Sequence, residues 1–305
     1  IILLLVLIVL SLNLTACLGG HEVENVRAKI KNHLYEKYGE EFVVDRIGTR
    51  SSRGQEFYQA RIYPKSILGT EKEADSYYYA SASVDKLSFG RLGGVGDSYS
   101  YITRNIDMEK YLLPQVKETF GERTLVKVNV EHKVTGDGSW WAGYKSKSLE
   151  EMKREVKKDP EHNRIELDLD VYIFDKIEDD KEKEGRRQQI FEFVQYLKDE
   201  GLFEYLELGV ILIDERVLAP SYNGFEWDIR YADKVKKEIE GETVRMPPMD
   251  LREKMSKQLQ EEVNKMSKEE LLASMRSIRK NDLDYEYLDK YNAIHYGLIY
   301  SVGIL

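Results

Sequence analysis

From Ile165 to Ile173 every second residue is apolar, within a segment that reads RIELDLDVYIF. Successive side chains of a β-strand point to opposite faces, so this pattern predicts a strand with one face in a core and the other in water. Residues 124–134, TLVKVNVEHKV, alternate in the same way and predict a second strand. Such strands need a layer over their apolar face, and amphipathic helices can supply it.

The patterned part of the chain opens with a helix. Apolar residues recur at steps of three and four positions from Val23 to Tyr38, and Gly39 follows as a stop signal. Three more strands are predicted in the first half, over residues 41–50, 56–64 and 77–84. Residues 87–100 hold four glycines and are predicted to be a loop, before a helix that runs from Asp107 to Phe120.

The second half repeats a similar alternation of helices and strands. Helices are predicted over residues 149–157 and 185–200, and strands over residues 164–174, 205–214 and 225–231. Together the elements predict an α+β fold, with antiparallel sheets and helices packed on one face. Whether the halves are two similar subdomains stays open, because their sequences share little.

The charge balance bears on the partner. The chain of 305 residues has 46 Lys and Arg against 55 Asp and Glu, a net charge of −9 at pH 7. This disfavours a nucleic-acid partner, since such proteins displace counterions with a basic surface. The single cysteine, Cys17, excludes an intramolecular disulfide, and the five histidines are scattered. We therefore predict neither a metal ion nor a cofactor.

The N-terminal region predicts the location. Residues 1–12, IILLLVLIVLSL, are uncharged but shorter than the roughly 20 residues of a membrane-spanning helix, and are typical of a signal peptide whose charged start is missing here. Leu14-Thr15-Ala16-Cys17 then resembles the lipobox of bacterial lipoproteins: an aliphatic residue, two small residues and the cysteine that is lipidated. The resemblance covers residues 1–20 and implies that Cys17 carries a diacylglycerol thioether and becomes the first mature residue. A short transmembrane anchor with an incidental cysteine is the alternative.

The lipobox also divides the chain. We expect a signal peptide over residues 1–16, a lipid-anchored tether over residues 17–21, an α+β subdomain over residues 22–145, and a second one with a helical C-terminal section over residues 146–305. The four residues after Cys17 span at most about 15 Å. The expected location is the extracytoplasmic face of the cell membrane, with the folded part close to the lipid headgroups.

Catalytic motifs are missing from the sequence, which has no nucleophile elbow, P-loop or zinc-binding helix motif. Asp168 and Asp170 form a pair of carboxylates, an arrangement used in acid–base catalysis. Because they alternate with leucines, we interpret them instead as the solvent face of a strand. His132, on another alternating strand, is expected at the surface. No catalytic residue is predicted.

Two aromatic clusters are candidates for contact with a partner. Tyr77, Tyr78 and Tyr79 are adjacent, and tyrosine is enriched at interfaces, although strands also favour it for covering sheet faces. Trp140 and Trp141 fall in a predicted glycine-containing loop, where two neighbouring rings are hard to bury together. An exposed ring could contact a protein, a glycan or the headgroup layer. A loop folded back as a lid over the core is the alternative.

These features favour a lipid-anchored, non-enzymatic module that binds a protein partner near the membrane, for example an immunity or accessory factor. Two alternatives stay open. One is a cell-envelope enzyme that acts on wall or lipid substrates through an unrecognised carboxylate site. The other is a solute-binding lipoprotein, whose usual two lobes with parallel sheets fit the antiparallel pattern poorly.

Overall fold

The computed structural model describes residues 22–136, 138–142, 147–175, 179–225 and 249–283, with the side chains of residues 141–142 and 249–252 left out of the description. The chain forms two compact units that divide between Thr103 and Arg104. Each unit combines a β-sheet of four strands with helices, so the predicted α+β class is confirmed.

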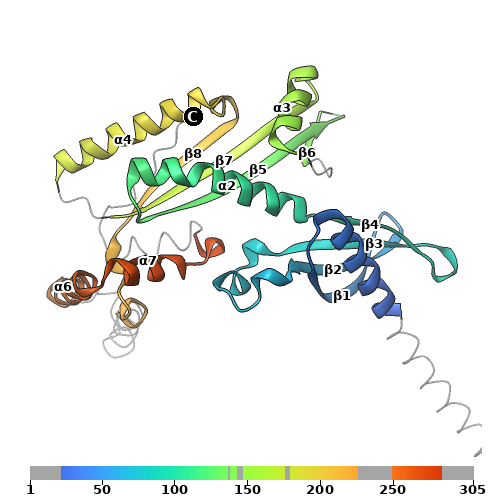
Figure 1. The fold of residues 1–305 in the computed structure, drawn as a ribbon, viewed down its shortest axis with the longest axis horizontal. Coiled ribbons are helices and arrows are strands. Elements are labelled where there is room, and N and C mark those ends of the chain that lie inside the picture. Colours follow the sequence, from blue (N-terminus) through green and yellow to red (C-terminus); the bar gives the residue numbers. More distant parts are fainter. Residues whose placement is uncertain (1–21, 137, 143–146, 176–178, 226–248, 284–305) are drawn as a thin grey trace, which may run out of the picture. The chain divides into compact units, whose positions relative to one another are not determined.

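The first unit is a helix followed by an antiparallel meander in the order β1-β2-β3-β4 (Figure 1). The helix spans residues 22–38, and its strands are β1 (Phe42–Ser52), β2 (Gln55–Pro64), β3 (Ala80–Lys86) and β4 (Leu92–Asp97). The apolar stripe predicted from the sequence is buried, with Val26, Ile30 and Leu34 fully inaccessible to solvent. Full burial of one such side chain stabilises a fold by roughly 1.5–3 kcal/mol.

Strand β4 replaces part of the loop predicted over residues 87–100. Its sequence, LGGVGD, shows no alternation because three of its six residues lack a side chain. Gly93 lies close to Asp85 of the neighbouring strand, where an added Cβ would stand 2.9 Å from the Asp85 Cβ. The glycines therefore permit a close approach of two strands.

The predicted strand over residues 77–84 begins later than expected. Residues Ser76–Tyr78 form a short 3₁₀ helix, η3, whose start is capped by the Asp75 carboxylate accepting from the Tyr77 amide. This capping interaction competes with an extended backbone at that position. The strand itself starts at Ala80.

The second unit has a sheet in the order β6-β5-β7-β8. Its strands are β5 (Thr124–Thr135), β6 (Trp140–Ala142), β7 (Asn163–Phe174) and β8 (Leu206–Ile213). Its helices are α2 (Tyr99–Phe120, which starts in the first unit), α3 (Leu149–Lys158), α4 (Asp180–Asp199), α6 (Met249–Lys265) and α7 (Lys268–Arg276). Strand β5 pairs with β6 and β7 in antiparallel fashion, whereas β7 and β8 are parallel. The prediction of antiparallel sheets is wrong for this last pair, because α4 carries the chain back to the end from which β7 starts.

Helices cover both faces of this sheet, not one (Figure 1). One face packs against α2, α3 and α4 through the alternating residues Ile165 to Ile173 of β7. The other face packs against α6 and α7 through Tyr172 and Phe174 of β7 and Ile211 and Ile213 of β8. The C-terminal residues of β7 and β8 are therefore buried on both faces of the sheet, as residues of parallel strands usually are.

The expected boundary between residues 145 and 146 falls inside the second unit. Strands β5 and β7, on either side of it, are neighbours in one sheet with eleven paired positions from Thr124↔Ile173 to Val134↔Asn163. The predicted strand over residues 225–231 also differs, since residues 222–225 are helical and the remainder lies outside the described residues.

Candidate functional site

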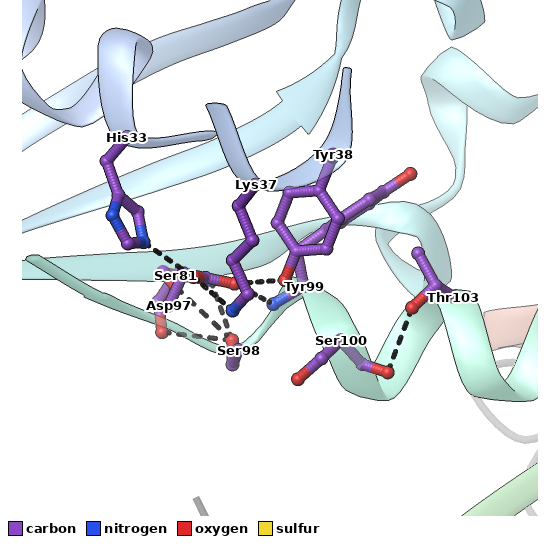
Figure 2. A network of polar contacts seen from close by, with 9 residues as sticks. All are labelled: His33, Lys37, Tyr38, Ser81, Asp97, Ser98, Tyr99, Ser100 and Thr103. Carbon is purple, nitrogen blue, oxygen red and sulfur yellow. Dashed lines mark hydrogen bonds and ion pairs between the residues drawn. The ribbon is translucent and has the colours of Figure 1, made fainter. Parts of the chain in front are cut away.

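A buried carboxylate organises a polar network in the first unit (Figure 2). Asp97 ends β4, and its side chain is 1% exposed. Asp97 Oδ2 accepts from Lys37 Nζ at 2.8 Å and lies 3.2 Å from His33 Nε2. Asp97 Oδ1 accepts from Tyr38 Oη at 2.6 Å and from the Tyr99 amide at 3.1 Å.

The neighbours of Asp97 keep it ionised. Burial by itself raises the pKa of this carboxyl, but the hydrogen bonds from Lys37 and Tyr38 outweigh burial and hold the pKa below its ordinary value. Burial and the bond to Asp97 raise the pKa of the Tyr38 hydroxyl. The proton between the two groups therefore stays on Tyr38.

The network is suited to holding elements together. Each Asp97 oxygen already has two partners, so little acceptor capacity is left for a substrate. The partners come from the last turns of the helix over residues 22–38 and from the first residue of α2. One side chain thus joins the N-terminal helix, β4 and the start of α2.

A cleft of about 380 Å³ opens in the second unit between α2, α3 and the end of α4. Its floor is apolar and includes Met108 of α2, Val130 of β5 and Met152 of α3, all buried. The volume lies in the range of about 300–1,000 Å³ that is usual for ligand pockets. The cleft can therefore hold an apolar side chain or a small ligand.

Charged and aromatic groups line the opening of this cleft. Tyr111 of α2 is 51% exposed and donates a hydrogen bond to the Glu200 carboxylate, which raises the pKa of its hydroxyl. Arg104 Nη1 lies 3.2 Å from the sulfur of Met152. Asp107 and Glu150 carry exposed carboxylates at the opening. An apolar floor with charges of both signs around it matches the general anatomy of protein interfaces.

The paired carboxylates of β7 differ in their surroundings. Asp168 is exposed and accepts from Asn129 Nδ2 at 3.2 Å, in accordance with a solvent-facing strand. Asp170 is half-buried, and its carboxylate stands over Gly209 of β8, where an added Cβ would lie 2.3 Å from Asp170 Oδ1. Burial, followed by weaker repulsion from Asp168 and Glu207, raises the pKa of Asp170, although Lys127 and Tyr172 oppose the shift.

The aromatic residues predicted for partner contact do not form one exposed patch. Tyr78 is buried and meets Tyr77 edge to face, with ring centroids 5.2 Å apart. Tyr79 is half-buried and stacks on Tyr63, and the Arg61 guanidinium lies 4.9 Å from the Tyr79 ring. Tyr79 therefore packs on Tyr63 near the end of β2, and Tyr77 and Tyr78 pack on each other.

The predicted tryptophan loop is in part a strand. Trp140 lies on β6, opposite Thr135 of β5, and is half-buried with the Arg164 guanidinium 4.5 Å from its ring. The side chain of Trp141 lies outside the described residues, as does Cys17. Trp140 therefore keeps a partly accessible ring on the edge strand of the second sheet.

His132 is not at the surface. It is 1% exposed, and the expectation is wrong because His132 and the buried valines of β5 occupy the same face of the strand. Burial, followed by the charge of Lys147, lowers the pKa of its imidazole. Within the described residues no group of three or more His, Cys, Asp or Glu side chains is placed to hold a metal ion.

Known proteins give no guide to this fold. A scan against protein-family models and searches of curated proteins and of solved structures each found no match. In the described part of the chain, no helix is long and apolar enough to cross a membrane.

Sequence reasoning missed both Asp97 and the cleft around Tyr111. Asp97 lies about sixty positions from the helix residues that bind it, and no local spacing signals such a contact. The cleft joins residues of α2, α3 and α4 that are likewise distant in the chain. A partial signal existed in Tyr111, an exposed aromatic residue about one helical turn after the buried Met108 on α2.

Proposed function

We propose that this protein is a membrane-anchored extracytoplasmic lipoprotein that binds another protein near the membrane surface and does not act as an enzyme. The anchor is Cys17, the sole cysteine of the sequence, in the context Leu14-Thr15-Ala16-Cys17. An immunity or accessory factor is one concrete form of such a module.

The cleft beside Tyr111 carries the binding part of this proposal. A half-exposed tyrosine over an apolar floor gives a partner both contact area and a hydrogen-bonding group. Tyrosine is among the residues that dominate the energetics of interfaces, commonly by about 2 kcal/mol or more each. The opening carries charges of both signs, so a partner segment with charged residues beside an apolar one would match it.

The test is capture of partners from membranes by the lipidated chain, followed by mass spectrometry and a direct binding measurement. The substitution Tyr111→Ala is expected to weaken binding of the captured partner about tenfold or more. Tyr35→Ala is the matched control, since Tyr35 is also an exposed tyrosine on a helix but belongs to the first unit. Equal binding by both variants and the unchanged chain would refute the cleft as the contact site.

One observation favours the enzyme alternative. Asp170 combines a raised pKa with a neighbouring carboxylate, Asp168, a pairing found in acid–base catalysis. Asp170→Asn would abolish hydrolysis of cell-wall or lipid substrates if this alternative held. Under the proposed function the chain shows no such hydrolysis, and Asp170→Asn leaves partner binding unchanged.

A further inference from the structure

The turn between β3 and β4 exposes two large apolar side chains. Phe89 is 98% exposed and Leu87 is 44% exposed. Phe89 also has a φ of 61°, in the left-handed region that bulky residues rarely adopt. An aromatic ring in water on a strained backbone does not stabilise this turn, and such exposed apolar groups mark contact surfaces.

The same turn lies beside the start of the N-terminal helix. A hollow of about 650 Å³ is lined by Glu22, by residues 54–56 of the β1–β2 turn, and by residues 86–88 and 90–92 around Phe89. Figure 1 shows the β3–β4 hairpin and the start of this helix within the same unit. Both hairpin turns and the first described residue of the helix therefore share one end of the unit.

The length of chain between Cys17 and Glu22 limits how far this end of the unit can lie from the membrane. Four residues separate Glu22 from Cys17, and they span at most about 15 Å. A diacylglycerol on Cys17 would therefore hold Glu22 within that distance of the lipid headgroups, with the two turns across the hollow from it. Phe89 and Leu87 would stand where an apolar side chain can enter a bilayer.

Arginines at this end complement an anionic surface. Arg50 lies near the end of β1 and Arg53 lies in the β1–β2 turn. Both are exposed, and neither forms an ion pair within the described residues. Arg91 follows Phe89 and is also exposed. The guanidinium group binds phosphate through paired hydrogen bonds, and each basic residue near an anionic membrane strengthens binding.

The carboxylates at this end have partners of their own. Glu22 accepts a hydrogen bond from the Tyr58 hydroxyl, and Glu56 pairs with Lys86 at 3.4 Å. Asp85 is the remaining exposed acid on β3 near the turn. Glu56 and Lys86 cancel, and the three arginines exceed Glu22 and Asp85 by one charge, so this end keeps a small positive excess around an apolar tip.

We propose that the β3–β4 turn is a second membrane contact, in which Phe89 and Leu87 enter the interface of an anionic bilayer and the nearby arginines bind lipid phosphates. This inference rests on the proposed lipid anchor at Cys17. The turn would fix the orientation of the first unit on the membrane, which an anchor at a single residue does not do.

The experiment uses the full chain purified from membranes and reconstituted into vesicles of phosphatidylglycerol and phosphatidylcholine. A Ser88→Cys variant carries an environment-sensitive fluorophore next to Phe89. Glu71→Cys carries the same fluorophore on the β2–β3 connection at the opposite end of the sheet. The unsubstituted chain, treated with the same label, reports any free sulfur at Cys17, and the mass of the N-terminal peptide shows whether Cys17 is lipidated.

The expected result is a blue shift and quenching by brominated lipid tails for the probe at position 88, and neither for the probe at position 71. Phe89→Gly should reduce both effects at position 88 while raising the melting temperature, since glycine adopts the left-handed backbone without strain. Phe191→Ala, which removes an exposed ring from α4, should change neither effect.

Two outcomes separate the inference from the proposed function. A lipidated N-terminal peptide with equally water-exposed probes at positions 88 and 71 would overturn the membrane contact and leave the anchor standing. An unlipidated Cys17 would overturn the anchor, and the probe at position 88 in the presence of vesicles would still decide whether the turn enters a bilayer.

Discussion

Tyr38 Oη donates a hydrogen bond of 2.6 Å to Asp97 Oδ1 and so joins the last turn of the N-terminal helix to the end of β4. The other oxygen of the same carboxylate contacts Lys37 and His33, which lie one helical turn apart. Asp97 is thereby the point at which the helix, the sheet and the start of α2 of the first unit are connected.

Asp97→Asn is expected to lower the free energy of unfolding by about 2–3 kcal/mol, because hydrogen bonds to charged groups contribute about 1.5–3 kcal/mol. Urea denaturation measures this loss. Asp85→Asn, on the exposed side of β3, is the matched control and should stay within about 0.5 kcal/mol of the unchanged chain. An Asp97→Asn chain as stable as the control would contradict the role of this network.

The lowered pKa of Asp97 also predicts how the free energy of unfolding falls at acidic pH. The unfolded chain binds a proton at this residue near its ordinary pKa of about 3.9, before the folded chain does. The contribution of Asp97 is therefore present above that pH and is lost as the pH falls through the lower pKa of the folded state. Asp97→Asn should flatten this part of the curve, measured by urea midpoints across the acid range.

Substitutions at Gly209 and Asp170 should have strongly non-additive effects on the free energy of unfolding. A Cβ at position 209 would stand 2.3 Å from Asp170 Oδ1, so Gly209→Ala must displace this carboxylate and should cost roughly 1–3 kcal/mol. In an Asp170→Ala chain the same change at position 209 should cost much less. A double-mutant cycle by urea denaturation measures the difference, and additive effects would argue against the contact.

The lowered pKa of His132 predicts a loss of folding stability at mildly acidic pH. Burial lowers the pKa of its imidazole, so the unfolded chain takes up this proton first as the pH falls below about 6.5. Stability from neutral His132 is complete above that pH and declines below it, until the lower pKa of the folded state is reached. The difference in unfolding free energy between about pH 7.5 and about pH 5.5 should be smaller for His132→Asn. An unchanged difference would show that His132 is not the group responsible.

Strands with alternating apolar side chains could be predicted from the sequence, and strands without this alternation could not. Strands β5 and β7 follow from their alternating apolar residues, which occupy one face of the sheet. Strand β4 was missed because Gly93, Gly94 and Gly96 leave no side chains to alternate. The parallel pairing of β7 with β8 had a signal, since both strands end in runs of consecutive apolar residues, which indicate burial on two faces.

The candidate sites depend on contacts between distant parts of the chain. No spacing links His33 or Lys37 to Asp97, and none links Tyr111 to the residues of α3 that share its cleft. The exposed ring of Phe89 was not predicted either, because only a loop was expected over residues 87–100.

The anchor at Cys17 is the central claim, and cell fractionation with mass analysis of the N-terminal peptide tests it most directly. In the unchanged chain, Cys17 should be the first residue, carry a diacylglycerol and remain in the membrane fraction. Cys17→Ala should move the protein to the medium or leave it as an uncleaved precursor, whereas Ala16→Gly, which keeps a small residue before the cleavage site, should behave as the unchanged chain. A Cys17→Ala protein that is cleaved normally and stays bound to the membrane would contradict the account.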